Sequence, residues 1–380
     1  MADYRIVALV VLALLAVAGL FAWLLRRGRD PTSESADPRD GAAIDASANL
    51  LAAFEDPLMV VRERRVLIAN KAARDLLGAH IEGSDVRLAI RHPAAAEHLA
   101  GDGGEETVRT ELVGLGELGR PWEMIVAPLP DGNRLVRLAD QSQARAAEQM
   151  RVDFVANASH ELRTPLATLI GFLETLQEGD EAVDDATRAR FIGIMSGEAL
   201  RMRDMIDDLM SLSRIEAERF ALPKDVVDLV PLIDEVKAAV KPLANGRTIR
   251  VERRSGETLV NGDRTQLGQL LHNLVVNALK YGRAGTPVRI RLDDAGADLI
   301  GLAVIDKGDG IAADHIPRLT ERFYRVDPGR SRQVGGTGLG LAIVKHIVLR
   351  HRGRLEIAST VGKGTEVRVT LPRAAPLSQN

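Results

Sequence analysis

Residues 154–176 of the chain read FVANASHELRTPLATLIGFLETL. The seam residues of this stretch recur at alternating spacings of four and three, which predicts a helix of a coiled coil or four-helix bundle. These seam residues are Val155, Ser159, Leu162, Leu166, Leu169, Leu173 and Leu176. His160 comes one position after a seam residue, so its ring is expected to project from the side of the bundle and not into its core.

A second seam follows after the polar segment EGDEAVDD, residues 178–185. It consists of Met195, Ala199, Met202, Ile206 and Leu209, again at spacings of four and three. The two segments therefore predict a helical hairpin. Because a hairpin alone has too narrow a core to be stable, we expect two copies of the chain to pair as a homodimeric four-helix bundle.

Pro165 lies inside the first predicted helix, five residues after His160. Proline has no N–H, so the carbonyl of Glu161 loses its usual partner and the helix axis is expected to kink beside the histidine. The alternative is that Pro165 marks the first turn of a helix and that His160 is merely an exposed residue. Residue properties alone leave both interpretations open.

A polar helix face is predicted in QLLHNLVVNALKYG, residues 269–282. Asn273, Asn277 and Lys280 are spaced by four and three, opposite apolar leucines. Amide oxygens suit Mg²⁺, and an ammonium group can neutralise phosphate oxygens. On its own such a face is usually just solvated. The chain contains no G-x-x-x-x-G-K-[ST] motif, which excludes a P-loop.

The next polar group follows an apolar strand in LAVIDKGDGI, residues 302–311. Asp306 stands at the end of this strand, where its carboxylate could accept a hydrogen bond from an exocyclic amine such as that of adenine. Gly308 and Gly310 follow, and their missing side chains would let a planar group lie against the backbone. This segment is a candidate base-binding site.

A glycine-rich segment, GGTGLGLAIVKHIV at residues 335–348, precedes an apolar helix. Gly336, Gly338 and Gly340 would leave the helix N-terminal N–H groups facing a phosphate. The spacing is not G-x-G-x-x-G and no buried strand precedes it, which excludes a Rossmann site. Phe323, between the two glycine segments, is a candidate residue of the nucleotide site, with a simple hydrophobic plug for a mobile loop as the alternative role. GKGT at residues 362–365 is expected to be a turn.

SHELRTPL, residues 159–166, resembles the phosphoacceptor box of the sensor histidine kinases of two-component systems. The downstream strings resemble, in order, the N, G1, F and G2 boxes of the histidine-kinase ATPase domain, an α/β sandwich shared in outline with gyrase, Hsp90 and MutL. This resemblance covers residues 145–373. It implies autophosphorylation of His160 from ATP, with Glu161 as proton acceptor, and transfer to an aspartate of a cognate response regulator.

The resemblance also implies roles for the other residues. Asn277 would bind Mg²⁺, Lys280 and Tyr281 would approach the nucleotide, Asp306 would contact adenine, and the glycines would shape an ATP lid. The string from Glu161 to Thr164 is similar to the E-x-x-T motif of phosphatase activity toward the phospho-regulator. Gly282 departs from the family, which often has Ser or Thr there. A gyrase-like clamp ATPase and a catalytically silent membrane scaffold are the alternatives.

The N-terminal run IVALVVLALLAVAGLFAWLL, residues 6–25, has no charge and is long enough to cross a bilayer. Trp23 and the following RRGR favour a retained helix over a cleaved signal peptide. The excess of arginine after the run places the rest of the chain in the cytoplasm, on the inner membrane. With no outer domain predicted, the stimulus would arrive through a membrane partner such as a transporter complex or its regulator, or through the next module.

That module is predicted as a small α/β unit. Strand-like runs PLMVV and VLIAN flank RERR, KAARDLLG follows, and three further strands end near Asp140. The order resembles a PAS sensor domain.

His80, His92 and His98 have no ligand spacing and are interpreted as surface residues rather than a haem or metal site. The chain has no cysteine, which excludes a covalent flavin adduct and disulfides. Its net charge of −3, without a basic block, argues against nucleic acid.

The predicted organisation is multidomain: a transmembrane anchor and basic flank (1–30), a flexible linker (31–49), a PAS-like α/β sensor domain (50–140), a dimeric four-helix-bundle phosphoacceptor domain (145–220), an α/β-sandwich ATP-binding domain (225–373) and a tail (374–380). Among histidine kinases, this arrangement looks most like the phosphate-regulon sensor kinases.

Overall fold

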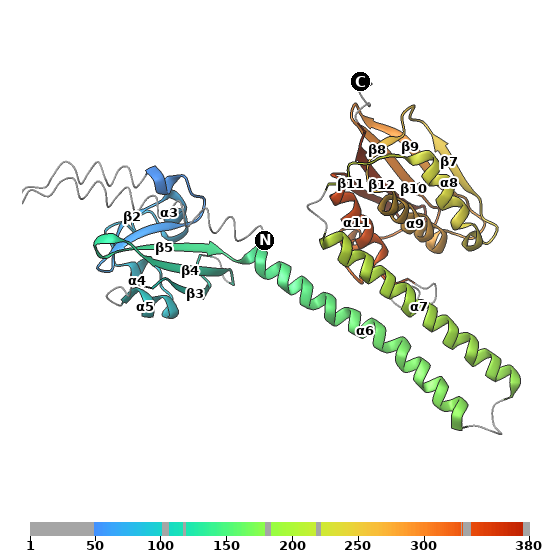
Figure 1. Ribbon diagram of the computed structural model, residues 1–380, viewed down its shortest axis with the longest axis horizontal. Coiled ribbons are helices and arrows are strands. Elements are labelled where there is room, and N and C mark those ends of the chain that lie inside the picture. Colours follow the sequence, from blue (N-terminus) through green and yellow to red (C-terminus); the bar gives the residue numbers. More distant parts are fainter. Residues whose placement is uncertain are drawn as a thin grey trace, which may run out of the picture. The chain divides into compact units, whose positions relative to one another are not determined.

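A computed structural model describes residues 49–100, 106–116, 119–178, 184–217, 222–327, 329 and 336–374 (Figure 1). The chain forms two compact units that divide between Asp153 and Phe154. The predicted membrane span and linker lie outside the described residues. Among the residues that are described, no helix is long and apolar enough to cross a membrane.

The first unit is built on a five-stranded antiparallel sheet in the order β2-β1-β5-β4-β3. Its strands are β1 (Leu58–Arg62), β2 (Arg65–Ala69), β3 (Val108–Val113), β4 (Pro121–Pro128) and β5 (Asn133–Asp140). The predicted β1–β2 hairpin is confirmed. Its two-residue turn consists of Glu63 and Arg64, and both have a positive φ. A turn with this conformation matches the right-handed twist of the paired strands.

Three short helices complete this unit: α3 (Lys71–Leu77), α4 (Val86–Ala89) and α5 (Pro93–Ala100). Asn70 caps α3, because its side chain accepts from the Ala73 amide at 2.9 Å, and Gly78 ends it. The apolar face of the sheet packs into a core that includes Met59, Met124 and Leu138. The predicted α/β unit is thus confirmed, whereas α4 and α5 were not predicted individually. The PAS assignment stays a prediction.

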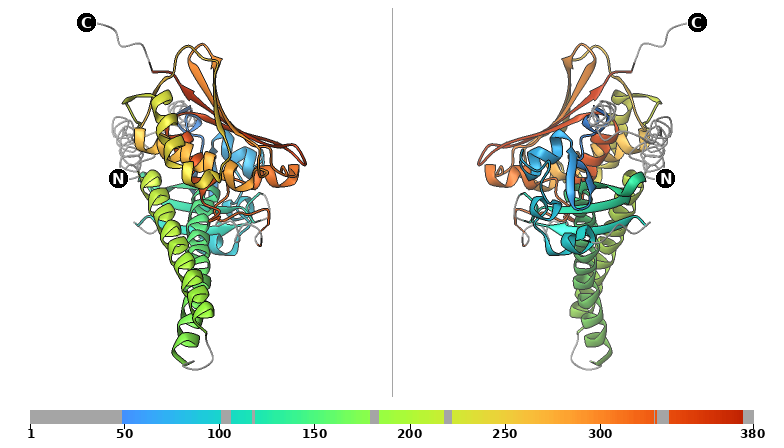
Figure 2. Two further views of the ribbon diagram at one scale, coloured as in Figure 1. Left: turned by 90° about the vertical axis from the view of Figure 1, so that its right-hand side faces the viewer. Right: turned by 90° about the vertical axis from the view of Figure 1, so that its left-hand side faces the viewer.

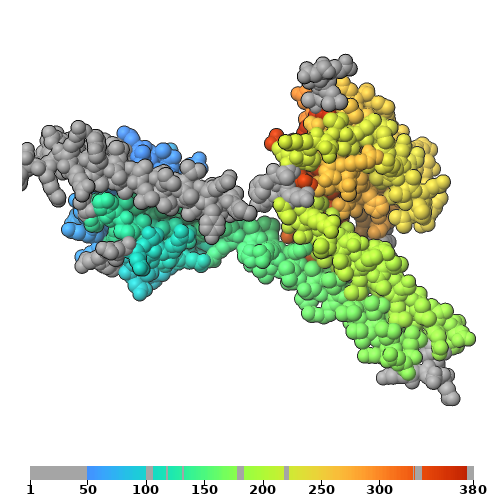
Figure 3. Space-filling model, in the orientation of Figure 1, coloured from blue at the N-terminus to red at the C-terminus, as the bar shows by residue number. Residues whose placement is uncertain are grey.

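Two long helices open the second part of the chain. α6 (Ser142–Glu178) runs across the boundary between the units, and α7 (Asp185–Ala217) returns beside it (Figures 1 and 2). The rings of Phe172 and Phe191 are 4.8 Å apart, which joins the two helices. Figure 3 shows that the end of the hairpin nearest its connection extends away from the rest of this unit.

The predicted seams are only partly covered within one chain. Leu162, Leu169 and Leu176 are half-buried, whereas Leu166 and Leu173 keep 47% and 49% of their surface exposed. On α7, Ile192, Leu200, Ile206 and Met210 are exposed as well. The hairpin therefore carries more apolar surface than its own two helices bury.

The rest of the unit is an α/β sandwich. Its five-stranded sheet has the order β11-β12-β10-β9-β7, in which only β7 runs parallel to its neighbour. The strands are β7 (Ile249–Arg253), β9 (Val288–Gly296), β10 (Leu299–Ile305), β11 (Arg354–Thr360) and β12 (Gly364–Pro372). A separate ribbon pairs β6 (Val226–Asp228) with β8 (Leu259–Asn261).

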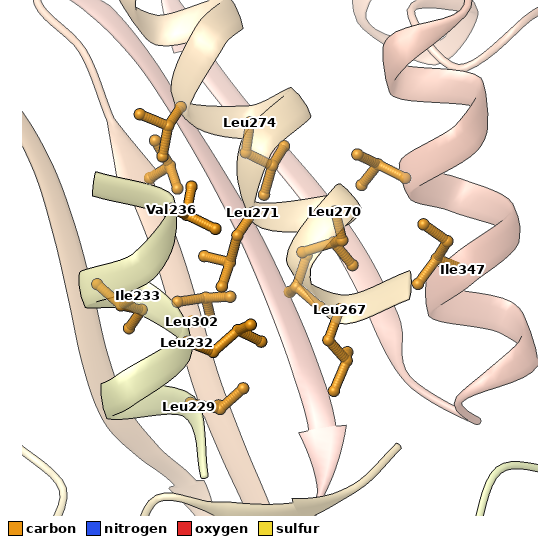
Figure 4. Close-up of a cluster of buried hydrophobic side chains, with 14 of the residues drawn as sticks. Leu229, Leu232, Ile233, Val236, Leu267, Leu270, Leu271, Leu274, Leu302 and Ile347 are labelled. Atoms are coloured by element: carbon orange, nitrogen blue, oxygen red, sulfur yellow. The ribbon is translucent and has the colours of Figure 1, made fainter. Parts of the chain in front are cut away.

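Helices α8 (Leu229–Ala239), α9 (Arg264–Tyr281) and α11 (Gly340–Arg350) cover one face of this sheet (Figure 4). Leu267, Leu270, Leu271 and Leu274 of α9 are almost fully buried against it. Burial of each such side chain stabilises the fold by about 1.5–3 kcal/mol. This packing leaves the opposite face of α9, with its two asparagines, turned away from the sheet.

Candidate active site

His160 is exposed on the side of α6, as predicted from its place beside the seam. It borders a cavity of about 320 Å³ in the second unit. The cavity lies between α6 and the segment around Phe323. Its lining residues are Asn157, His160, Glu161, Arg318, Glu321, Arg322, Phe323 and Tyr324. Two segments that lie about 160 residues apart in the sequence thus meet at the predicted phosphoacceptor.

Pro165 is buried in the interior of α6, which continues through it without a break. The alternative that the proline marks a helix start is therefore wrong. Thr164, just before it, is exposed, and its hydroxyl donates to the carbonyl of His160 at 3.4 Å. Thr164 and His160 are one helical turn apart, so both side chains lie on the same face of α6.

Glu161 does not point freely into solvent. Its Oε2 accepts from Nη2 of Arg325 at 2.8 Å, and the same nitrogen donates to the carbonyl of Thr337 at 3.0 Å. The Arg325 side chain is only 6% exposed. One buried arginine thus connects the carboxylate beside His160 to the residue that precedes the last glycines of the lid segment.

Phe323 has a φ of 63°, an uncommon backbone for a bulky residue. Its N–H donates to the carbonyl of Gly338 at 3.0 Å. A Cβ on Gly338 would lie 2.9 Å from the Phe323 backbone, so this position requires glycine. The Phe323 ring lies 6.0 Å from that of Phe154 on α6 and packs against the core. The predicted plug is therefore seated between α6 and the glycine-rich segment.

The amide face of α9 meets the N-terminus of α11. Nδ2 of Asn273 donates to the carbonyl of Gly340 at 3.4 Å, and a Cβ on Gly340 would lie 3.8 Å from both Asn273 and Asn277. Both asparagines are half-buried. The first N–H groups of any α-helix have no partner within the helix. This corner therefore combines amide groups with a helix N-terminus, which suits a phosphate ligand.

Lys280 completes the face and interacts electrostatically with α7. The charges of Asp208 and Asp204 act on Lys280, while burial lowers the pKa of its ammonium. Burial also raises the pKa of Asp208, against the opposing effects of a hydrogen bond and of Lys280. That hydrogen bond comes from the Thr337 hydroxyl, which donates to Oδ2 of Asp208 at 2.8 Å. Tyr281 ends α9 with 38% of its surface exposed.

Asp306 lies at the end of β10, where burial raises the pKa of its carboxyl. Its Oδ1 accepts from the Gly308 amide at 2.7 Å. The structure gives a further reason for the two glycines that follow. A Cβ on Gly308 would lie 2.3 Å from the Tyr281 carbonyl, and one on Gly310 would lie 2.1 Å from the Thr360 carbonyl. They therefore permit close backbone packing around Asp306.

Gly282, the residue that departs from the family pattern, has no space for a side chain. A Cβ there would lie 2.5 Å from both the Ala278 carbonyl and Nη2 of Arg247. Arg247 donates to the carbonyls of Leu279 and Thr286 at 2.6 and 3.0 Å. The guanidinium thus fills the end of α9, where the last carbonyls of a helix lack helical partners.

These residues fit ATP as a ligand. Lys280, the amides of Asn273 and Asn277 and the start of α11 supply donors for phosphate oxygens, and Asp306 supplies an acceptor at a separate point. Within the described residues, no group of three or more His, Asp or Glu side chains could hold a metal by itself. A Mg²⁺ ion that accompanies ATP usually keeps phosphate oxygens and water among its ligands, so a single amide oxygen of a protein can be enough to complete its site.

Three residues of this region were not predicted from the sequence: Asp208, Arg247 and Arg325. Each acts through a contact with a residue at least 30 positions away. No local period or motif marks such contacts. Asp208 carries only a weak signal, since it lies in the acidic run of MRDMIDD on a helix whose partners the sequence does not reveal.

Two family profiles match the chain. Residues 150–218 match the His Kinase A (phospho-acceptor) domain, and residues 262–375 match the histidine kinase-, DNA gyrase B- and HSP90-like ATPase. The first match contains His160, and the second contains the amide face of α9, Asp306 and the lid glycines.

Among curated proteins, the phosphate regulon sensor protein PhoR of Pseudomonas aeruginosa is 37% identical over 333 residues, which span 85% of this chain and 73% of that protein. The sensor-like histidine kinase SenX3 of Mycolicibacterium smegmatis is 39% identical over 240 residues, 63% of this chain and 62% of that protein. Among solved structures, the histidine kinase ThkA in complex with the response regulator TrrA matches with a TM-score of 0.49 and 18% identity, over 86% of this chain and 98% of that one.

Proposed function

Because the chain belongs to the sensor histidine kinases of two-component systems, we propose that His160 is its phosphoacceptor and that the α9–α11 corner holds the ATP. The observation that carries this assignment is the cavity that His160 and Glu161 share with Phe323 and its neighbours. An exposed imidazole at that cavity can be approached by a phosphoryl group, whereas a core histidine could not.

In this proposal one ring nitrogen of His160 attacks the γ-phosphorus of ATP, while the other ring nitrogen loses its proton to Glu161. ATP supplies the phosphoryl group and leaves as ADP, and Mg²⁺ beside Asn277 would neutralise the phosphate oxygens. Asn273 and Asn277 orient the phosphates, Lys280 offsets their charge, and Asp306 accepts from the adenine amine. In the described arrangement Arg325 contacts Oε2 of Glu161, so the proton goes to the other carboxylate oxygen unless the ion pair opens first.

The bland interpretation of these residues is that polar side chains on α9 are solvated and that His160 is a surface histidine. Three observations weigh against it. The asparagines are half-buried, Gly340 lies next to them, and the exposed His160 borders a cavity. A solvated face needs none of these features.

We propose further that two copies of the chain associate through α6 and α7. The exposed apolar residues Leu166, Leu173, Ile206 and Met210 support a bundle with a second hairpin. The apolar run at residues 6–25 supports anchoring in the inner membrane with the catalytic part in the cytoplasm. The likeness to PhoR supports a role in phosphate signalling, with a response regulator as partner and input from a transporter complex or the PAS-like unit.

The experiment is incubation of the purified chain with ATP labelled in the γ-phosphate. A kinase gives acid-labile label on the protein, and this label moves to a response regulator that is added later. Free phosphate without labelled protein would identify a clamp ATPase. Neither product would identify a silent scaffold, and either of these last two results would overturn the proposal.

A further inference from the structure

The face of α7 that meets the ATPase part carries an acid at the point where a nucleotide phosphate is expected. Asp208 accepts from the hydroxyl of Thr337 at 2.8 Å and interacts with the charge of Lys280. Asp204, one turn earlier, acts on the same ammonium. Thr337 belongs to the glycine-rich segment and Lys280 to the amide face of α9, so Asp208 is hydrogen-bonded to one half of the proposed site and acts electrostatically on the other.

We infer that Asp208 is an internal counter-ion of the nucleotide site, whose carboxylate holds the place beside Lys280 and Thr337 that a phosphate of ATP must take. This inference rests on the proposed function, because it assumes that Lys280 faces the phosphates. It adds a residue of the phosphoacceptor hairpin to the nucleotide site and makes α7 a competitor of ATP.

The chemistry of the two ligands explains the competition. A carboxylate and a phosphate are both oxygen anions, and both accept from an ammonium and a hydroxyl. They cannot share these donors in a half-buried place, because two anions at close range repel strongly where water is partly excluded. Entry of ATP must therefore push Asp208 away from Lys280, or it must fail.

Displacing Asp208 affects a larger contact, because the last part of α7 makes further contacts with the ATPase part. Ser211 donates to Oε1 of Gln269 on α9 at 2.8 Å. Glu216, near the end of α7, pairs with Arg322 and lies 3.3 Å from Nε2 of His346 on α11. Leu212 and Ile215 are buried between these polar contacts. ATP binding and this docking of α7 are thus coupled, and each must weaken the other by the same factor.

The first test measures ATP·Mg²⁺ affinity of the full chain in which His160→Gln prevents turnover. Asp208→Asn keeps the shape of the side chain and removes its charge. We expect its Kd for ATP to fall about fivefold or more, the usual lower limit for coupled sites. Asp207→Asn is the matched control, because it removes the same charge from the exposed neighbouring position. Equal affinities in the two variants would overturn the inference.

The second test fixes the docking without touching Asp208 or Lys280. The chain has no cysteine, so Ser211→Cys with Gln269→Cys gives a unique pair that a short bifunctional thiol reagent can join. The cross-linked chain should bind ATP at least fivefold more weakly than the same chain before cross-linking. Adding Asp208→Asn should restore most of the affinity. Unchanged binding after cross-linking would contradict the competition.

Asn277→Ala separates failure of this inference from failure of the proposed function. If Asn277→Ala loses ATP binding while Asp208→Asn behaves like its control, the nucleotide site stands and only the role of Asp208 is wrong. If Asn277→Ala still binds ATP normally, the nucleotide site itself is misassigned, and the proposed competition between Asp208 and ATP is then wrong as well.

Discussion

The carboxylate of Glu161 and the guanidinium of Arg325 form an ion pair of 2.8 Å between α6 and the segment that precedes the lid glycines. The arginine is almost fully buried, and its Nε has no hydrogen-bond partner. Such a pair is costly to break by removing one partner, because the other charge is left buried. It therefore connects the state of the proposed proton acceptor to the position of the glycine-rich segment.

Glu161→Gln tests the proposed proton acceptor. The amide keeps the size of the side chain and can still accept from Arg325, so the fold and ATP binding should remain intact. The rate of autophosphorylation should fall by about 100-fold or more, which is the usual contribution of a positioned base. The measurement is the initial rate of label incorporation at saturating ATP, and a rate within a factor of three of the parent chain would remove Glu161 from this role.

Thr164→Ala tests a second reaction at the same face of α6. Thr164 is exposed and one turn from His160, so its hydroxyl could hold a water in line with the phosphoryl-aspartate of a docked regulator. Autophosphorylation should persist, while most phosphatase activity should be lost. The decay of purified phospho-regulator is followed with ATP or ADP present. Decay as fast as with the parent chain would show that Thr164 has no such part.

Gly282→Ser restores the residue type that the family often has at this position. The structure predicts that it destabilises this chain by about 1–3 kcal/mol, because the new Cβ would overlap the Ala278 carbonyl and Arg247. Urea unfolding measures the change. Gly256→Ala is the control, since a Cβ there has open space around it. Equal stability of Gly282→Ser and the parent chain would show that Arg247 moves aside at little cost.

His351 predicts a pH dependence of stability. It is buried, its Nε2 accepts from the Asp263 amide at 3.0 Å, and its Nδ1 lies 2.7 Å from the Ile347 carbonyl, so only the neutral ring satisfies both contacts. Burial lowers its pKa below the ordinary 6.5. The unfolded chain therefore protonates His351 at a higher pH than the folded chain does. The contribution of the neutral His351 ring to the free energy of unfolding is complete above pH 6.5 and is lost as the pH falls below this value.

The measurement for His351 is the urea midpoint of the parent chain and of His351→Gln between pH 7.5 and 5.5. The parent midpoint should drop over this range more than that of the variant. His80→Gln, at an exposed histidine of the first unit, is the control and should keep the parent's slope. A parent slope equal to that of His351→Gln would contradict the assignment.

Local patterns were enough to predict the elements that carry the candidate site and their order along the chain. The periodicity around His160 predicted α6 and the exposure of its ring, and two strand-like runs separated by RERR predicted the hairpin of β1 and β2. The amide face of α9 followed from spacing alone, because residues three and four apart share a helix face. Each of these patterns depends only on residues within one short segment, so it can be recognised in the sequence.

Long-range contacts could not be predicted in this way. The reason for glycine at positions 308 and 310 is the approach of Tyr281 and Thr360, and at position 282 it is Arg247. Asp208 and Arg325 act through partners on other elements. The exposure of Leu166 and Leu173 likewise depends on which helices pack against the hairpin. The spacing of the seam residues does not tell whether those helices belong to the same chain or to a second copy.

Whether His160 is the phosphoacceptor is measured by locating the phosphoryl group after incubation with labelled ATP. We expect acid-labile label on the parent chain and none on His160→Gln, while both bind ATP with the same affinity because His160 lies outside the nucleotide corner. Peptide mapping should place the label on the segment that contains His160. Acid-labile label that persists in His160→Gln, or that maps to another histidine, would contradict the account.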